Sequence, residues 1–125
     1  DPKNPGVLKR VIATQQDLQA GQVQMLNWAQ LPVGSSFQPH YHEDMQEVFV
    51  LLNGLVTMTV RTSSSRGSSN KDGGDANDCI TMRPGDTVVI DPTEIHQMQN
   101  IGDVVAEYIV FGISSRNGGK TVVVS

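Results

Sequence analysis

The chain has 125 residues, of which 38% are hydrophobic and 18% are charged, and its formal net charge is −4. These values fit one globular domain spanning residues 1–125, with a single hydrophobic core. The acidic balance argues against nucleic-acid binding, which relies on basic surface, and no apolar run has the length of a membrane span.

Cys79 is the only cysteine, so no disulfide can form within the chain. We therefore expect a reducing, cytoplasmic compartment, and we interpret Cys79 as a small core residue. A periplasmic or secreted protein stays open as an alternative, because the chain begins at Asp1 and not at Met.

The N-terminal part of the chain predicts two strands with a short turn region between them. Residues 7–12 (VLKRVI) predict a strand, and residues 14–21 predict at most one or two helical turns. Residues 22–31 (QVQMLNWAQL) predict a second strand. Its alternation of apolar and polar residues slips between Met25 and Leu26, which is typical of a β-bulge.

The rest of the chain continues this pattern of short strands. Residues 47–52 (EVFVLL) predict an apolar strand, and the Asn53-Gly54 pair predicts a tight hairpin to a strand over residues 55–60. Further strands are predicted over residues 79–82, 87–90, 96–100, 104–112 and 121–125, with turns at 83–86, 91–94 and 101–103. Many short strands, frequent turns and little or no helix predict an all-β sandwich or barrel.

Residues 62–78 predict a long loop. They are rich in Ser, Gly, Asn and Asp, and Ala76 is their one apolar residue. Such a segment cannot bury a hydrophobic face, so we expect a flexible Ser/Gly-rich surface loop that metal binding does not need. A lid over a ligand site is the alternative interpretation.

Two of the three histidines, His40 and His42, are separated by one residue. Residues two apart in an extended segment face the same side, so both imidazoles would point the same way. Glu47 joins them only if the mainly polar segment 43–46 bends the chain. The strand that Glu47 begins is apolar, and a buried carboxylate there needs a partner such as a cation.

The third histidine, His96, opens the strand expected over residues 96–100. Neutral imidazoles combined with a carboxylate suit a divalent transition metal, whether Fe, Mn, Ni, Zn or Cu. A structural zinc site fits less well, because such sites are rich in thiolate and Cys79 stands alone.

The spacing of these residues resembles the two sequence motifs of the cupin superfamily. The first motif is matched at each defined position, by Gly34, His40, His42, Glu47 and Gly54. The chain also resembles the second motif, at Gly85, His96 and Asn100. Its turn departs from the family, which usually has Pro where this chain has Asp91 and Gly where it has Thr93. These departures concern the shape of the turn more than the ligand after it.

This resemblance implies a small, single-domain, metal-binding cupin, which is an antiparallel jelly-roll β-barrel with a metal at one end. It also implies one divalent transition metal as cofactor, and the ligands that it implies are His40, His42, Glu47 and His96. The loop over residues 62–78 would be a long version of the variable connection between the two motifs.

The pocket around the metal is expected to be mainly apolar. No Lys or Arg lies between Val11 and Val60, so the strands with the first ligands bring no cation. The arginines that could reach the site from elsewhere are Arg10, Arg61, Arg83 and Arg116. The residues expected in the substrate pocket are Phe49, Met98, Trp28 and Tyr108. Leu51 and Met25 are alternatives for this pocket, but we interpret both as core residues.

Cupins include dioxygenases, isomerases, decarboxylases, lyases and ligand-binding proteins, and the fold alone does not choose among them. We expect a metal-dependent, dioxygenase-type oxidoreductase that acts on a small, weakly charged organic molecule. The alternatives are a non-catalytic ligand-binding or sensor cupin, an isomerase- or lyase-type cupin, and a barrel that keeps its metal for stability. We also expect a homodimer, because the strands at both ends of the chain would lie free at sheet edges.

Overall fold

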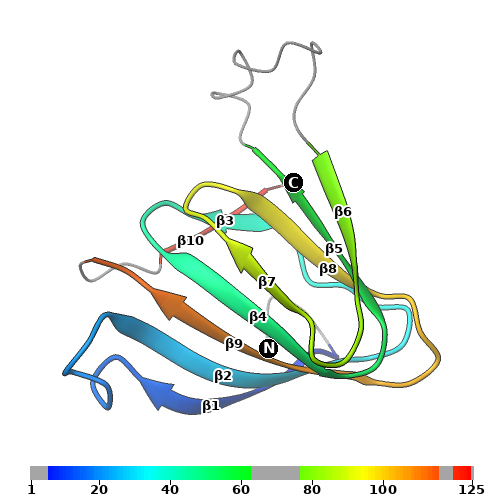
Figure 1. The fold of residues 1–125 in the computed structure, drawn as a ribbon, viewed down its shortest axis with the longest axis horizontal. Helices are drawn as coiled ribbons and strands as arrows, with labels where there is room; N and C mark the ends of the chain where they lie inside the picture. The colour runs from blue at the N-terminus through cyan, green and yellow to red at the C-terminus, as the bar shows by residue number, and fades with distance from the viewer. Residues whose placement is uncertain (1–5, 63–76, 116–119, 125) are drawn as a thin grey trace.

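The computed structural model describes residues 6–62, 77–115 and 120–124, which form two antiparallel five-stranded sheets (Figure 1). The first has the order β1-β2-β9-β4-β7, with strands Leu8–Thr14, Val23–Leu31, Ala106–Ile113, Gln46–Asn53 and Thr87–Ile90. The second has the order β10-β3-β8-β5-β6, with strands Thr121–Val123, His40–His42, Ile95–Asn100, Val56–Arg61 and Asn77–Met82. The predicted all-β jelly roll is confirmed. None of the described residues belongs to a helix of the length and apolar character that a membrane span requires.

The hydrophobic core lies between the two sheets and follows the period-two pattern of their strands. On β4, Glu47, Phe49 and Leu51 are buried, while the residues between them are less so. On β9, Tyr108 and Val110 are buried in the same alternation. Because successive side chains of a strand point to opposite faces, this pattern puts the Glu47 carboxylate inside the molecule.

The predicted hairpin at Asn53-Gly54 is wrong. Strand β4 pairs with β7 and β9, whereas β5 pairs with β6 and β8, so the turn carries the chain from one sheet to the other. Gly54 has a φ of 102°, and a Cβ there would lie 2.9 Å from the Cα of Ala106. The glycine therefore allows the chain to pass close to Ala106 as it crosses between the sheets. An Asn-Gly pair is typical of a hairpin turn, and the local sequence alone does not distinguish the two cases.

The N-terminal strands differ from the prediction in two details. The β-bulge of β2 against β9 lies at Gln24, and not between Met25 and Leu26. Residues 15–20 form hydrogen-bonded turns and no helix. The position of the bulge decides which residues of β2 face the interior, because an extra residue reverses the alternation of a strand.

The region around the expected loop over residues 62–78 also differs. Most of that loop, residues 63–76, lies outside the described residues, and Asn77 and Asp78 belong to β6. Cys79 is exposed on β6, so the expectation of a core position is wrong. The reason is that β6 is an edge strand whose residues 77–81 are all exposed.

Candidate metal centre

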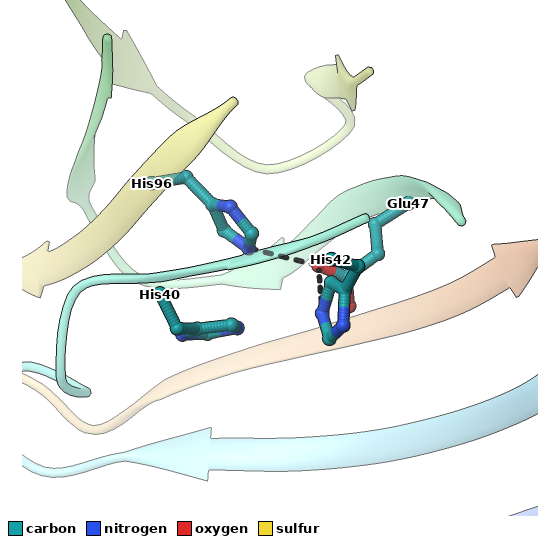
Figure 2. Close-up of side chains that lie close together, drawn as sticks. All are labelled: His40, His42, Glu47 and His96. Atoms are coloured by element: carbon teal, nitrogen blue, oxygen red, sulfur yellow. Dashed lines mark ion pairs between the residues drawn. The ribbon is translucent and has the colours of Figure 1, made fainter. Parts of the chain in front are cut away.

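Four potential ligands from three strands converge on one point (Figure 2). His40 and His42 lie on β3, Glu47 lies on β4 and His96 lies on β8. One donor atom from each residue lies within 4.8 Å of the others. The bend expected before Glu47 is present at residues 43–44, and it turns the carboxylate toward the histidines.

The backbone around the histidines holds them together. His40 pairs with His96 across β3 and β8. In the turn before β8, the N–H of Thr93 donates a hydrogen bond of 2.7 Å to the carbonyl oxygen of His42. Thr93 has a φ of 71°, a left-handed conformation that is unfavourable for a β-branched residue. The turn therefore contacts the ligand strand even though Thr93 stands where cupins usually have Gly.

The distances between the donor atoms suit a single metal ion. Oε1 of Glu47 lies 3.0 Å from Nε2 of His42 and 2.8 Å from Nε2 of His96. Two donors at about 2.1 Å from one ion and at right angles lie about 3 Å apart. Oε1 of Glu47 and Nε2 of His96 are buried and make no hydrogen bond of acceptable geometry. A metal cation would satisfy both atoms, so these residues fit the cofactor that their pattern implies.

The hydrogen bonds of the imidazoles determine which ring nitrogen is available. In each histidine Nδ1 lies close to a backbone carbonyl oxygen. The acceptors are Gln38, Lys120 and Glu94, at 2.8, 3.2 and 3.1 Å from His40, His42 and His96 respectively. Because a carbonyl oxygen only accepts, Nδ1 carries the proton, and Nε2 of the neutral ring presents a lone pair. This is the arrangement in which outer hydrogen bonds orient metal-binding histidines.

The charge states at neutral pH also favour metal binding. Burial acts to raise the pKa of Glu47, but protons carried by the facing Nε2 atoms of His42 and His96, the alternative to a cation between these atoms, outweigh burial and lower the pKa from 4.5 to about 2. Burial, together with the nearby His96, lowers the pKa of His40 from 6.5 to about 4. Glu47 is therefore ionised and His40 is neutral, as metal ligands must be.

A cavity of about 590 Å³ lies beside the four residues, and His40, His42 and Glu47 line it. Most of its other lining side chains are apolar. The ring of Phe37 stacks on that of Phe49 at a centroid distance of 6.2 Å, and the ring of Phe49 lies 5.6 Å from that of His96. A cavity of this size with one polar focus suits a small organic molecule.

Two of the four residues expected in the pocket line the cavity, namely Phe49 and Tyr108. Met98 is instead fully buried in the core. Trp28 lies on the outer face of β2, where the guanidinium of Arg10 is 5.6 Å from its ring. The expected pocket positions of Met98 and Trp28 are therefore corrected. For Trp28 the reason is the bulge at Gln24, after which the odd-numbered residues of β2 face inward.

Sequence reasoning missed several residues that line the cavity. Met45 follows the bend before Glu47 and packs against Gly112, where a side chain would collide with its sulfur. Phe37 precedes the ligand strand, and its ring lies 5.2 Å from that of His40. Met25, interpreted from the sequence as a core residue with a pocket position as the alternative, also lines the cavity. The alternation of β2 could have identified Met25 once the bulge was placed.

Lys9 on β1 also lines the cavity, and it is the only Lys or Arg among the described residues that does. Lys9 lies two residues from both Val7 and Val11, and residues two apart on a strand face the same side. This spacing was the sequence signal that places Lys9 beside the two valines. Arg10, Arg61 and Arg83 do not line the cavity, and Arg116 lies outside the described residues.

Comparisons with known proteins agree with this fold. Residues 27–112 match the family model described as "Cupin domain". A germin-like protein of Arabidopsis thaliana (subfamily 1 member 1) is 31% identical over 100 residues, which are 78% of this chain and 42% of that protein. An uncharacterised protein of Methanocaldococcus jannaschii is 31% identical over 84 residues, which are 67% of this chain and 55% of that one. The chain thus spans about half the length of these relatives.

Solved structures with a similar fold include an oxalate oxidase and a protein from Thermotoga maritima. An oxalate oxidase superposes with a TM-score of 0.75 at 21% identity, covering 99% of this chain and 58% of that chain. A structure from Thermotoga maritima described as a predicted oxalate decarboxylase superposes with a TM-score of 0.68 at 21% identity, covering 86% and 80%. At this level of identity the likeness concerns the fold.

Proposed function

The chain belongs to the cupin domain family, and on this premise we propose that His40, His42, Glu47 and His96 bind one divalent transition metal. The observation that carries the proposal is the arrangement of the buried Glu47 carboxylate. Its Oε1 faces Nε2 atoms at 2.8 and 3.0 Å on rings whose Nδ1 protons are donated to carbonyl oxygens. Only a proton or a cation between these atoms makes so close an approach favourable.

We propose further that the metal serves the oxidation of a small organic molecule by dioxygen, in a dioxygenase-type reaction. A divalent transition metal with four protein ligands keeps coordination positions for a small ligand and supplies Lewis-acid and redox chemistry. The oxalate oxidase fold neighbour supports an oxygen-using activity. The apolar cavity walls formed by Phe37 and Phe49 would hold the substrate and exclude water beside the four ligands.

A metal-dependent lyase is the second candidate. It is favoured by the fold neighbour described as a predicted oxalate decarboxylase. Both reactions use the same ligands, and they differ in whether dioxygen is consumed. A non-catalytic binding protein would use the same cavity without turnover.

An oxygen electrode combined with product analysis tests the proposed activity. Metal-loaded protein is given a series of small carboxylic acids that includes oxalate and glycolate. We expect oxygen uptake that depends on one of these acids, is equimolar with substrate loss, and is absent in Glu47→Gln. Release of CO₂ without oxygen uptake would reject the oxidation and indicate the lyase. Tight binding of an acid without turnover would reject both reactions and indicate a binding protein.

We also propose that the protein is a homodimer. Strand β1 is an edge of the first sheet, and β10 is an edge of the second. Leu8, Val11 and Ile12 on β1 are about half exposed, at 58%, 53% and 49%. An apolar edge of this kind is a common place for a second chain to pair.

A further inference from the structure

Three residues from adjacent strands form one row across the first sheet, inside the cavity. Lys9 on β1 pairs with Ala29 on β2, and Ala29 pairs with Tyr108 on β9. Residues paired in this way face the same side of a sheet, and all three line the cavity. The neighbouring Arg10 faces the opposite side, over the ring of Trp28.

The small side chain of Ala29 leaves space in the middle of this row. Adjacent strands are about 4.8 Å apart, so the Cα atoms of Lys9 and Tyr108 are separated by about 10 Å. The Lys9 ammonium group is carried on a flexible four-carbon stem, and a tyrosine ring carries its hydroxyl far from the backbone. Both donors can therefore reach a ligand group that lies above the methyl group of Ala29.

The chemistry of the row suits an anion. Lys9 supplies a positive charge, and no other Lys or Arg among the described residues lines the cavity. Burial, with the charge of Glu47, raises the pKa of Tyr108 far above its usual value, so its hydroxyl stays protonated and can donate. An ammonium and a phenol together are strong donors to a carboxylate.

An aromatic wall connects this row to the four metal ligands. The ring of Phe49 lies 5.9 Å from the ring of Tyr108 and 5.6 Å from that of His96. The ring of Phe37 stacks on the same Phe49 ring. A ligand that reaches from the row to the metal ligands would therefore lay an apolar middle part along Phe49.

We propose that Lys9 and Tyr108 form a carboxylate-binding subsite above Ala29, which holds one end of an amphiphilic monocarboxylate whose other polar end lies at His40, His42, Glu47 and His96. This inference rests on the proposed function, because it names the substrate class of the same site. It replaces the weakly charged molecule expected from the sequence by a singly charged acid with an apolar body.

Calorimetric titration with 4-hydroxyphenylalkanoates, whose phenol supplies the second polar end, tests the subsite. The probes are 4-hydroxyphenylacetate, 3-(4-hydroxyphenyl)propionate and 4-(4-hydroxyphenyl)butyrate, each compared with its neutral amide. For the wild type we expect the acid of best-fitting length to bind at least about tenfold more tightly than its amide, the effect of a charge-assisted hydrogen bond. Lys9→Met should remove this preference and leave amide binding unchanged. Tyr108→Phe should weaken acid binding severalfold. Arg10→Met, the adjacent cation on the outer face, should change neither.

Metal content is measured on every variant by elemental analysis, so that the subsite and the metal site are judged separately. A Lys9-dependent preference for the acid in a protein that binds no metal would support the subsite and reject the proposed metal function. Three results would overturn the subsite: no acid in the series binds at millimolar concentration, Lys9→Met binds the acid as tightly as the wild type, or the acid preference depends on the histidines and not on Lys9.

Discussion

Asn100 shows how a residue of a metal-binding motif can serve structure. It is buried at the end of β8, and its Nδ2 donates to the carbonyl oxygens of Leu31 and Val104 at 2.9 and 2.8 Å. Its Oδ1 accepts a hydrogen bond of 2.9 Å from the N–H of Gly102. The side chain thus joins the turn after β8 to the end of β2, in the opposite sheet.

Replacing Asn100 with Ala should destabilise the protein without removing the metal. Three hydrogen bonds are lost and the buried carbonyl of Leu31 loses a donor, so we expect a loss of about 2–4 kcal/mol in the free energy of unfolding. Urea denaturation measures this loss. Gln99→Ala, at the neighbouring exposed position, is the control and should change stability by no more than about 0.5 kcal/mol. Equal effects of the two substitutions would contradict the structural role of Asn100.

At the residue scale, the spacing of the two motifs was enough to predict that His40, His42, Glu47 and His96 converge. The residues that form the walls of the cavity could not be predicted, because they depend on which face of each strand points inward. A bulge at Gln24 rather than after Met25 turns Trp28 outward. Likewise, the spacing of Lys9 from Val7 and Val11 indicates which residues share its face, but the pairing with Ala29 that turns this face inward is not local in the sequence.

At the scale of the elements, the connection between β4 and β5 shows which features of the fold local sequence signals predict and which they do not. The sequence predicted both strands and the turn at Asn53-Gly54, because apolar alternation and turn residues are local signals. It predicted the wrong partner for each strand. The true partners of β4 are β7 and β9, distant in the chain, and burial of the inner faces of both sheets selects them.

Gly54→Ala should cost more stability than Gly85→Ala. Both glycines have positive φ, at 102° and 95°, so either substitution introduces backbone strain of about 1–2 kcal/mol. Only at Gly54 would the new Cβ meet backbone, at 2.9 Å from the Cα of Ala106, whereas nothing lies within 4 Å at Gly85. We expect losses of about 3 kcal/mol for Gly54→Ala and about 1 kcal/mol for Gly85→Ala, measured by urea denaturation. Similar losses at the two positions would show that the crossing relaxes easily.

At the scale of the whole molecule, the first sheet ends in two edge strands, β1 and β7, neither of which has a second neighbour among the described residues. Strand β1 has exposed apolar residues on both of its faces, with Ile12 at 49% exposure, while β7 forms the opposite edge with Val89 at 52% exposure. Light scattering at micromolar concentration should give twice the mass of one chain. Ile12→Lys should shift the protein toward the monomer, because a charge would then lie at an apolar interface. Val89→Lys is the matched control and should leave the dimer intact, and a monomeric wild type would reject the dimer.

The central claim is that four side chains from three strands hold one metal ion, and elemental analysis tests it most directly. The protein is purified from metal-replete cells without chelator or metal-affinity resin, beside a variant in which His40, His42 and His96 are all replaced by Ala. We predict about one equivalent of a divalent transition metal per wild-type chain and nearly none in the triple variant. Full metal occupancy in the triple variant, or a folded wild type without bound metal, would contradict the account.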